Sequence, residues 1–453
     1  MTMMHSFCVT LFTMLFLAAA TAQDIPRLIT LDQAVAIALE KNRDLRSARL
    51  EVERADARVR EAWGYALPTL DLSGRYTRAL ERPVFFLPDF ANPGSNQTVA
   101  VEIGTAHSFD LTLSARQTLF NSTVIVGVGA ANVYSNAARQ LARGKEVETI
   151  ANVRKAFYGA LLAAEVRDLM RANLVNAEEN LANVRMLAKQ GLVSEYDELR
   201  ASVGVDNLRP EVIRAENNYA LSLDGLRSTI GIGVSESIDI AGKLEHKPVP
   251  EELTANAVQM VLETNPSLQA LRLQVLVNEA FVSAERSNYL PTLSAFGNLQ
   301  YQAAKNAFSI STGDFFRSAQ VGLTLSLNVF QGFQTNARMD QANVDVRKSE
   351  EQLASTEINL RTAAHSAVLQ LQQARQRIES QGKTIEQATR GYRIATTRFV
   401  NGSGTQLEVN DAQLALTQAN VNRIQAVYDY LVASADLDYI LGRLPETLTT
   451  TVQ

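Results

Sequence analysis

The sequence predicts a mainly α-helical protein with a membrane β-barrel part, built from two copies of one helix, strand-pair, long-helix and helix unit. Three observations predict this fold class. Matching residues recur along the 453-residue chain, two stretches without proline have the length of unusually long helices, and four segments alternate apolar and polar residues as strands do. At 1.5 Å per residue each long helix would span about 100 Å, which exceeds a compact domain of this size.

The first residues predict an exported protein. Residues 1–22 combine an apolar run from Phe7 to Ala19 with the small-residue pattern Ala20-Thr21-Ala22 that precedes signal-peptide cleavage. We therefore expect the mature chain to begin near Gln23. Cys8 is the only cysteine and lies inside this segment. The mature protein is thus expected to have no disulfide, thiolate metal site or cysteine nucleophile.

Composition excludes several classes of function. Lys and Arg total 43 against 48 for Asp and Glu, and without a concentrated basic patch we expect no nucleic-acid partner. After the signal segment, no apolar stretch approaches the roughly 18 residues of a membrane helix, so a membrane-spanning part must consist of strands. His107, His246 and His365 have no metal-ligand neighbour at helical spacing. We expect no metal, no cofactor and no enzymatic activity.

The duplication is visible in matching residues. Leu67-Pro68-Thr69-Leu70 recurs as Leu290-Pro291-Thr292-Leu293, and Asn42 recurs as Asn265. The glycine at position 191 likewise has a counterpart at 402. We predict a signal peptide over 1–22, a first repeat over 23–237, a linker over 238–253, a second repeat over 254–442 and a C-terminal tail over 443–453.

Each copy begins with a predicted helix and continues with two strands. The helices, over 31–66 and 254–289, stop before a proline, which cannot continue them. In the second copy Val321 and Leu323 alternate with Gln320 and Thr324, as expected of a strand with two different faces. The predicted strands cover 69–78, 107–119, 292–302 and 318–330.

A long helix and a shorter helix complete each copy. The long helices are predicted over 123–190 and 336–401, and the shorter helices end at Gly231 and Gly442, in the position favoured after a helix C-terminus. Apolar residues seven apart on the second long helix indicate coiled-coil packing. These residues are Leu371, Ile378, Ile385, Tyr392 and Phe399.

Four strands cannot close a membrane barrel within one chain. Such barrels begin at about eight strands, and open strand edges in lipid leave amide groups unpaired at a cost of several kcal/mol each. Other copies must therefore complete the barrel. From the strand number alone, two copies with eight strands and three copies with twelve both remain open.

The repeated motifs resemble a known family over essentially the whole mature chain. They are the two Leu-Pro-Thr-Leu motifs, Leu327–Gly332, Gly191 and Gly402, and Leu226 with Gly231 and Leu437 with Gly442. In this order they resemble the TolC-like outer-membrane efflux family. The resemblance implies a homotrimer in outer-membrane lipid, with a trimeric 12-stranded β-barrel continued by a long α-helical coiled-coil tunnel into the periplasm.

The resemblance also implies a function and its partners. We expect a passive channel of a tripartite efflux or type I secretion system, joined to a periplasmic adaptor (membrane fusion) protein and an inner-membrane transporter. A periplasmic coiled-coil adaptor is the alternative, disfavoured because adaptors carry one helical hairpin and compact β modules. A surface enzyme is a third class, for which no convergent acid, base or nucleophile is visible.

Candidate site residues lie at the two turns that follow the long helices. By family resemblance, Asp197, Glu408 and Asp411 match carboxylates that narrow the pore, where a threefold acidic ring would attract cations. The competing interpretation is helix capping, because Thr405 to Glu408 fits a capping box and Ser194 to Asp197 fits a looser version.

The turns themselves are candidate adaptor contacts. They comprise Gly191, Leu192, Val193, Gly402, Ser403 and Gly404. A plain helix-turn-helix connection would also use these glycines. Where members of the family latch the closed tip with a tyrosine and an arginine, this chain has Phe399 and Gly404. We therefore expect a tip held shut mainly by packing and helix winding.

Overall fold

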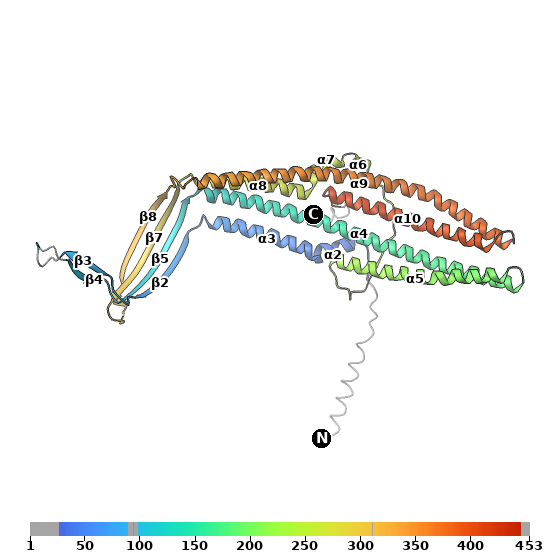
Figure 1. Cartoon of the computed structure of the whole chain (residues 1–453), viewed down its shortest axis with the longest axis horizontal. Helices are drawn as coiled ribbons and strands as arrows, with labels where there is room; N and C mark the ends of the chain where they lie inside the picture. Colours follow the sequence, from blue (N-terminus) through green and yellow to red (C-terminus); the bar gives the residue numbers. More distant parts are fainter. Residues whose placement is uncertain (1–26, 89–93, 95–97, 310, 445–453) are drawn as a thin grey trace, which may run out of the picture. The chain divides into compact units, whose positions relative to one another are not determined.

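A computed structural model describes residues 27–88, 94, 98–309 and 311–444 (Figure 1). The predicted signal peptide and most of the predicted tail lie outside these residues. The chain divides into two compact units. Unit 1 draws on Met1–Leu50, Gln140–Gln269 and Ser355–Gln453, and unit 2 on Glu51–Arg139 and Ala270–Ala354.

Long helices dominate the structure. The long helix of the first copy is α4 (Ser122–Lys189) and that of the second is α9 (Gln334–Val400), of 68 and 67 residues. Their bounds differ from the predicted ones by one or two residues. Each is followed by a shorter helix, α5 (Glu195–Ile230) or α10 (Gln406–Ile440). Among the described residues, none of the helices combines the length and apolarity needed to cross a membrane.

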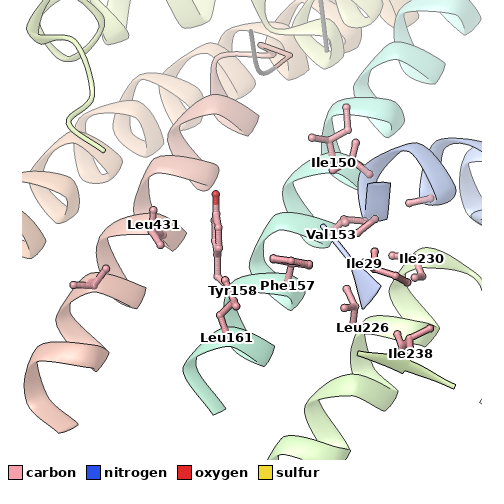
Figure 2. Close-up of a cluster of buried hydrophobic side chains, with 14 residues drawn as sticks. Ile29, Ile150, Val153, Phe157, Tyr158, Leu161, Leu226, Ile230, Ile238 and Leu431 are labelled. Atoms are coloured by element: carbon pink, nitrogen blue, oxygen red, sulfur yellow. The ribbon is translucent and has the colours of Figure 1, made fainter. Parts of the chain in front are cut away.

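The main core of unit 1 joins helices to a small parallel sheet. Strand β1 (Arg27–Ile29) pairs with β6 (Ile238–Ile240), and both contribute side chains to a cluster with α4, α5 and α10 (Figure 2). Ile29 and Phe157 are almost fully buried there. The predicted linker over 238–253 thus begins with a short strand, and its first residue, Ile238, is buried in this core.

A polar network also holds β6 to the helices. The Tyr219 hydroxyl on α5 donates to the Asp239 carboxylate, and the Arg167 guanidinium of α4 lies 4.2 Å from the centre of the Tyr219 ring. Burial and the hydrogen bond to Asp239 raise the pKa of Tyr219 to about 12. The phenol therefore stays a proton donor at neutral pH and ties α5 to the sheet.

The predicted first helices of both copies are broken by an asparagine. Helices α2 (Leu31–Lys41) and α3 (Arg43–Gly64) replace the single helix expected over 31–66. Helices α6 (Glu251–Ala255), α7 (Ala257–Thr264) and α8 (Pro266–Ser287) replace the helix expected over 254–289.

Each asparagine bonds in two directions. The Asn42 side chain accepts from the Leu45 amide and donates to the carbonyl of Thr229 at the end of α5, both at 3.0 Å. In the second copy Asn265 accepts from Leu268 at 3.0 Å and donates to Ile440 at 2.9 Å. The side chain thus caps the following helix and holds the end of the last helix of the same copy. This double role is the physical reason for the break.

Close backbone contact explains the glycine that ends each last helix. Gly231 and Gly442 have φ of 79° and 66°. A Cβ at Gly231 would lie 2.8 Å from the Lys41 carbonyl oxygen, and one at Gly442 would lie 2.8 Å from that of Thr264. Only glycine allows this backbone conformation without strain and this approach, so the repeated glycines close each copy on its own first helices.

Unit 2 contains a four-stranded antiparallel sheet. Its strands are β2 (Thr69–Arg78), β5 (His107–Phe120), β7 (Thr292–Lys305) and β8 (Phe316–Ser326), in the order β2-β5-β7-β8 (Figure 1). The strand predicted over 318–330 ends early, because its partner β7 begins at Thr292, opposite Ser326. Apolar alternation continues to Val329, but there is no strand to pair with.

The two strand connections differ. In the described part of the second there is a short 3₁₀ turn, η1 (Thr312–Asp314). The first, between the predicted strands 69–78 and 107–119, contains β3 (Val84–Pro88) and β4 (Thr98–Glu102), which pair with each other as a separate antiparallel ribbon. Pro, Gly and Asn are frequent between β3 and β4, as in loops, so the two short alternating segments are hard to recognise from the sequence.

Candidate functional site

The two helix turns have the same backbone structure. Gly191 and Gly402 both have φ of 72°. Each donates a hydrogen bond to the carbonyl three residues earlier, and the next residue donates to the carbonyl five residues earlier, at 2.9 to 3.0 Å. This is the Schellman arrangement that ends a helix on a left-handed glycine. No atom lies within 4 Å of a Cβ built at either glycine, so both turns are open on the outside.

A shared hydrophobic cluster, here called the tip cluster, brings the ends of four helices together in unit 1. It contains Ala177, Leu181, Val184, Ala201, Val205, Ala395, Phe399 and Val409. Phe399 of α9 is 7% exposed and thus packs with helices of the first copy. Val193 of the first turn packs against the same cluster, whereas Leu192 is exposed. Phe399 therefore holds the end of α9 to the first repeat by apolar packing.

The three candidate carboxylates have different surroundings. Asp197 accepts from both the amide and the hydroxyl of Ser194, at 3.3 and 2.6 Å, and Ser194 in turn caps the Asp197 amide. Glu408 lies 3.2 Å from Arg398. Asp411 is exposed, and within the described part of the chain its carboxylate has no hydrogen bond or ion pair. Of the three, Asp411 is the one whose charge stays available.

A complete capping box forms at the first turn, whereas the sequence pattern favours the second turn. The looser pattern, Ser194 to Asp197, makes both reciprocal bonds of a capping box. At Thr405 only the hydroxyl acts, accepting from the Glu408 amide at 3.3 Å. The Glu408 carboxylate instead reaches across the turn to Arg398. The ion pair with Arg398 on α9 therefore forms in place of the hydrogen bond from the Thr405 amide that would complete the capping box.

Arg398 is the residue that sequence reasoning missed. Besides Glu408, its guanidinium donates to the Ser403 carbonyl at 2.9 Å, and the Ser403 hydroxyl donates back to the Arg398 carbonyl at 3.2 Å. A Cβ at Gly404 would lie 3.0 to 3.2 Å from atoms of Arg398 and Phe399. The second turn is thus fastened internally, and a side chain at Gly404 would crowd Arg398 and Phe399. An arginine one position before Phe399 gives no recognisable motif.

The sheet of unit 2 has one apolar and one polar face. Residues paired across neighbouring strands point to the same face of the sheet, and in all three strand pairs this places apolar residues together on one face and polar residues together on the other. The apolar face carries Leu70, Leu72, Leu111, Leu113, Leu293, Leu299, Val321, Leu323 and Leu325. The polar face carries Asp71, Ser73, Asp110, Thr112, Asn298, Gln300, Gln320 and Thr324. Most of these apolar side chains are exposed in the single chain.

Helix α5 also presents an unpaired apolar stripe. Its buried face, which includes Ala201, Val205, Val212 and Ala215, follows the heptad pattern. A second stripe on another face also follows three- and four-residue spacing, with Asp206, Pro210 and Asn217 as its interrupting members. Its large apolar members, Tyr196, Leu199, Val203, Ile213 and Leu221, are 50 to 66% exposed.

The described residues hold no group of three or more His, Cys, Asp or Glu side chains that could bind a metal ion.

Comparison with known proteins identifies relatives along nearly the whole chain. The cobalt-zinc-cadmium resistance protein CzcC of Cupriavidus metallidurans is 23% identical over 92% of this chain and 90% of its own. Outer membrane protein TolC of Escherichia coli is 23% identical over 89% of this chain and 80% of its own. The crystal structure of outer membrane protein VceC from Vibrio cholerae has a TM-score of 0.74, at 17% identity, covering 91% of this chain and 96% of that one.

A family model described as outer membrane efflux protein matches residues 34–232 and 257–443. The matched ranges cover most of both predicted repeats. The comparisons confirm the predicted resemblance, the fold class and the role as an outer-membrane channel of an efflux or secretion system. They give no support to the alternative of a periplasmic adaptor. The chain belongs to the outer membrane efflux protein family.

Proposed function

We propose that three copies of the chain join their sheets into one twelve-stranded β-barrel in the outer membrane, continued by their helices as a conduit through the periplasm. The apolar face of each sheet faces lipid and the polar face lines the passage. Substrates cross passively after an inner-membrane transporter and a periplasmic adaptor deliver them.

The single observation that carries this proposal is the strand order β2-β5-β7-β8. Strands β2 and β8 each have one unpaired edge, and their faces show the alternation of membrane strands. In hydrocarbon every backbone amide and carbonyl needs a partner. Pairing β2 of one copy with β8 of the next satisfies both edges, and three copies leave an open passage where two would leave a lumen filled by side chains.

The exposed stripe of α5 supports the same assembly. Apolar residues at heptad spacing fit another α-helix running alongside, because this spacing keeps one face towards a partner helix. A second copy of the chain supplies such a helix. The stripe would then be buried between copies.

Purified full-length protein tests this assembly. In mild detergent we expect a mass of three chains by light scattering, a heat-sensitive trimer band in SDS gels, and steady ion conductance after insertion into planar bilayers. A water-soluble monomer without affinity for detergent would overturn the proposal. A stable dimer would overturn the twelve-stranded barrel.

The two turns are the proposed contact with the adaptor. They are open on the outside and held rigidly by their backbone hydrogen bonds, and the second is fastened further by Arg398. Rigid presentation lowers the entropy that binding must overcome. The relatives include an alkaline protease secretion protein and an antibiotic efflux pump outer membrane protein. Because their cargoes differ, we propose no cargo for this chain.

Bulk at Gly402 should weaken adaptor binding without disturbing the trimer. Gly402→Trp and Gly402→Asn both place a side chain at positive φ, which asparagine tolerates better, but only tryptophan covers the turn. We expect recovery of the adaptor by crosslinking in intact cells to fall about tenfold in Gly402→Trp, as for loss of a central contact. Recovery in Gly402→Asn should stay near the wild-type level. Equal recovery from all three proteins would contradict the contact.

Asp411 is the proposed member of an acidic ring at the narrow end. Its carboxylate is exposed, whereas Asp197 and Glu408 are engaged in local bonds. Repeated threefold, Asp411 would favour cations over anions. In this proposal Glu408 serves the turn through Arg398, and Asp197 serves as a helix cap.

A further inference from the structure

The ribbon formed by β3 and β4 has an apolar face that stays partly exposed among the residues that the structure describes. Register pairs Phe85 with Val101 and Leu87 with Val99, and Ile103 extends the same face, since its amide donates to the Pro83 carbonyl at 3.0 Å. These five side chains are 36 to 52% exposed. The opposite face is mixed, because it carries Thr98 and Glu102 beside the exposed Val84 and Phe86.

Such a ribbon needs a partner. An isolated two-stranded hairpin is marginally stable in water, and a third strand or another covering surface is required for stability. Because the ribbon is part of every chain, a covering surface that is always present fits it better than a partner that binds transiently.

The ribbon is joined closely to the strand pair β2–β5. The Ala79 amide donates to the Ala106 carbonyl at 2.9 Å, and Arg82 lies 2.5 Å from Glu102 at the base of the ribbon. Strand β2 is an edge strand of the sheet. In the proposed trimer this edge adjoins the next copy, so each ribbon starts beside a boundary between copies.

Lipid is an unsuitable cover for this face. Strand β2 has ten residues, and a tilted membrane strand needs about 9–11 to cross the bilayer. At its end Tyr76 and Phe109 pack together, with ring centres 4.6 Å apart, as aromatic residues do at membrane interfaces. Glu81 and Arg82 follow. The ribbon therefore begins beyond the hydrocarbon.

We propose that the three ribbons of one trimer pack their Phe85–Val101 faces against one another around the threefold axis, as a cap over the outer mouth. This inference rests on the proposed trimer. Attachment to one barrel holds the three ribbons at a high effective concentration, so little affinity per contact is required. The cap narrows the exit with apolar side chains, as hydrophobic constrictions do in other channels.

Adjacent cysteines on the two faces test the cap. Val99→Cys lies on the apolar face and Ala100→Cys on the opposite face, and the only natural cysteine, Cys8, lies in the predicted signal peptide. A short bismaleimide is added to isolated outer membranes. We expect covalent dimers and trimers from Val99→Cys, and at least about fivefold less from Ala100→Cys. Leu87→Cys, which pairs with Val99, should behave like Val99→Cys.

The outcomes separate the cap from the trimer. A heat-sensitive trimer that gives no crosslink at Val99 or Leu87, or equal crosslinks on both faces, overturns the cap and leaves the proposed function intact. Quenching of a fluorophore at Val99 by lipid-attached quenchers also overturns it. If the wild-type protein forms no trimer, the proposed function itself is overturned. Replacing 84–102 with a short Gly-Ser linker should raise single-channel conductance at least about twofold, and an unchanged conductance counts against the cap.

Discussion

Val321→Arg should prevent the protein from assembling in the outer membrane. Val321 is the central residue of β8, lies on the apolar face of the sheet and is 90% exposed in the single chain. An arginine at the bilayer midplane costs about 2–4 kcal/mol, and a trimer would carry it three times. We expect loss of the heat-sensitive trimer band and loss of the protein from the outer-membrane fraction.

Gln320→Arg is the matched control. Gln320 precedes Val321 and pairs with Asn298 on the polar face. An arginine there adds the same charge and volume, but it faces the proposed passage. We expect normal assembly and altered ion selectivity in planar bilayers. Normal assembly of Val321→Arg, or failure of Gln320→Arg alone, would show that the faces are assigned the wrong way round.

The faces of the sheet could be predicted because they depend on period alone. Side chains alternate strictly along a strand, so Val321 and Gln320 belong to opposite faces whatever lies nearby. The long helices are visible for a similar reason, since many residues contribute to one periodic pattern. The end of β8 could not be predicted in this way. It depends on where β7 begins, which is a property of the partner strand.

Breaks and bonds that depend on distant residues escaped prediction. Asn42 and Asn265 were recognised as a repeated pair, but their role requires the carbonyl groups of Thr229 and Ile440, which are remote in sequence. The capping box at Thr405 is only half formed, because Arg398 attracts the Glu408 carboxylate. In each case tertiary contact outweighs the local preference, and a local motif does not reveal which competitor is near.

Another contact between residues remote in sequence connects the two repeats within one chain. Arg154 of α4 lies 2.6 Å from Asp438 of α10, and their side chains are 13% and 26% exposed. Burial of Arg154 opposes its charge, but Tyr158 and Asp438 outweigh burial and raise the pKa of Arg154. Arg154 therefore keeps its positive charge at neutral pH.

Arg154→Met should lower the free energy of unfolding by about 2–3 kcal/mol, because it leaves the Asp438 carboxylate without its partner in a mostly buried position. The double variant Arg154→Met with Asp438→Leu should recover most of this loss, to within about 1 kcal/mol of the wild type, since apolar pairs can replace buried ion pairs. Arg185→Met, which breaks the more exposed pair with Glu198, should cost less than about 1 kcal/mol.

Denaturant unfolding in detergent, followed by circular dichroism at one protein concentration, measures the free energy of unfolding of the wild type and the three variants. If the double variant were as unstable as Arg154→Met, the loss of stability would come from lost packing of the arginine side chain and not from an unpaired Asp438 charge. The link between the two repeats of the chain would then not be electrostatic.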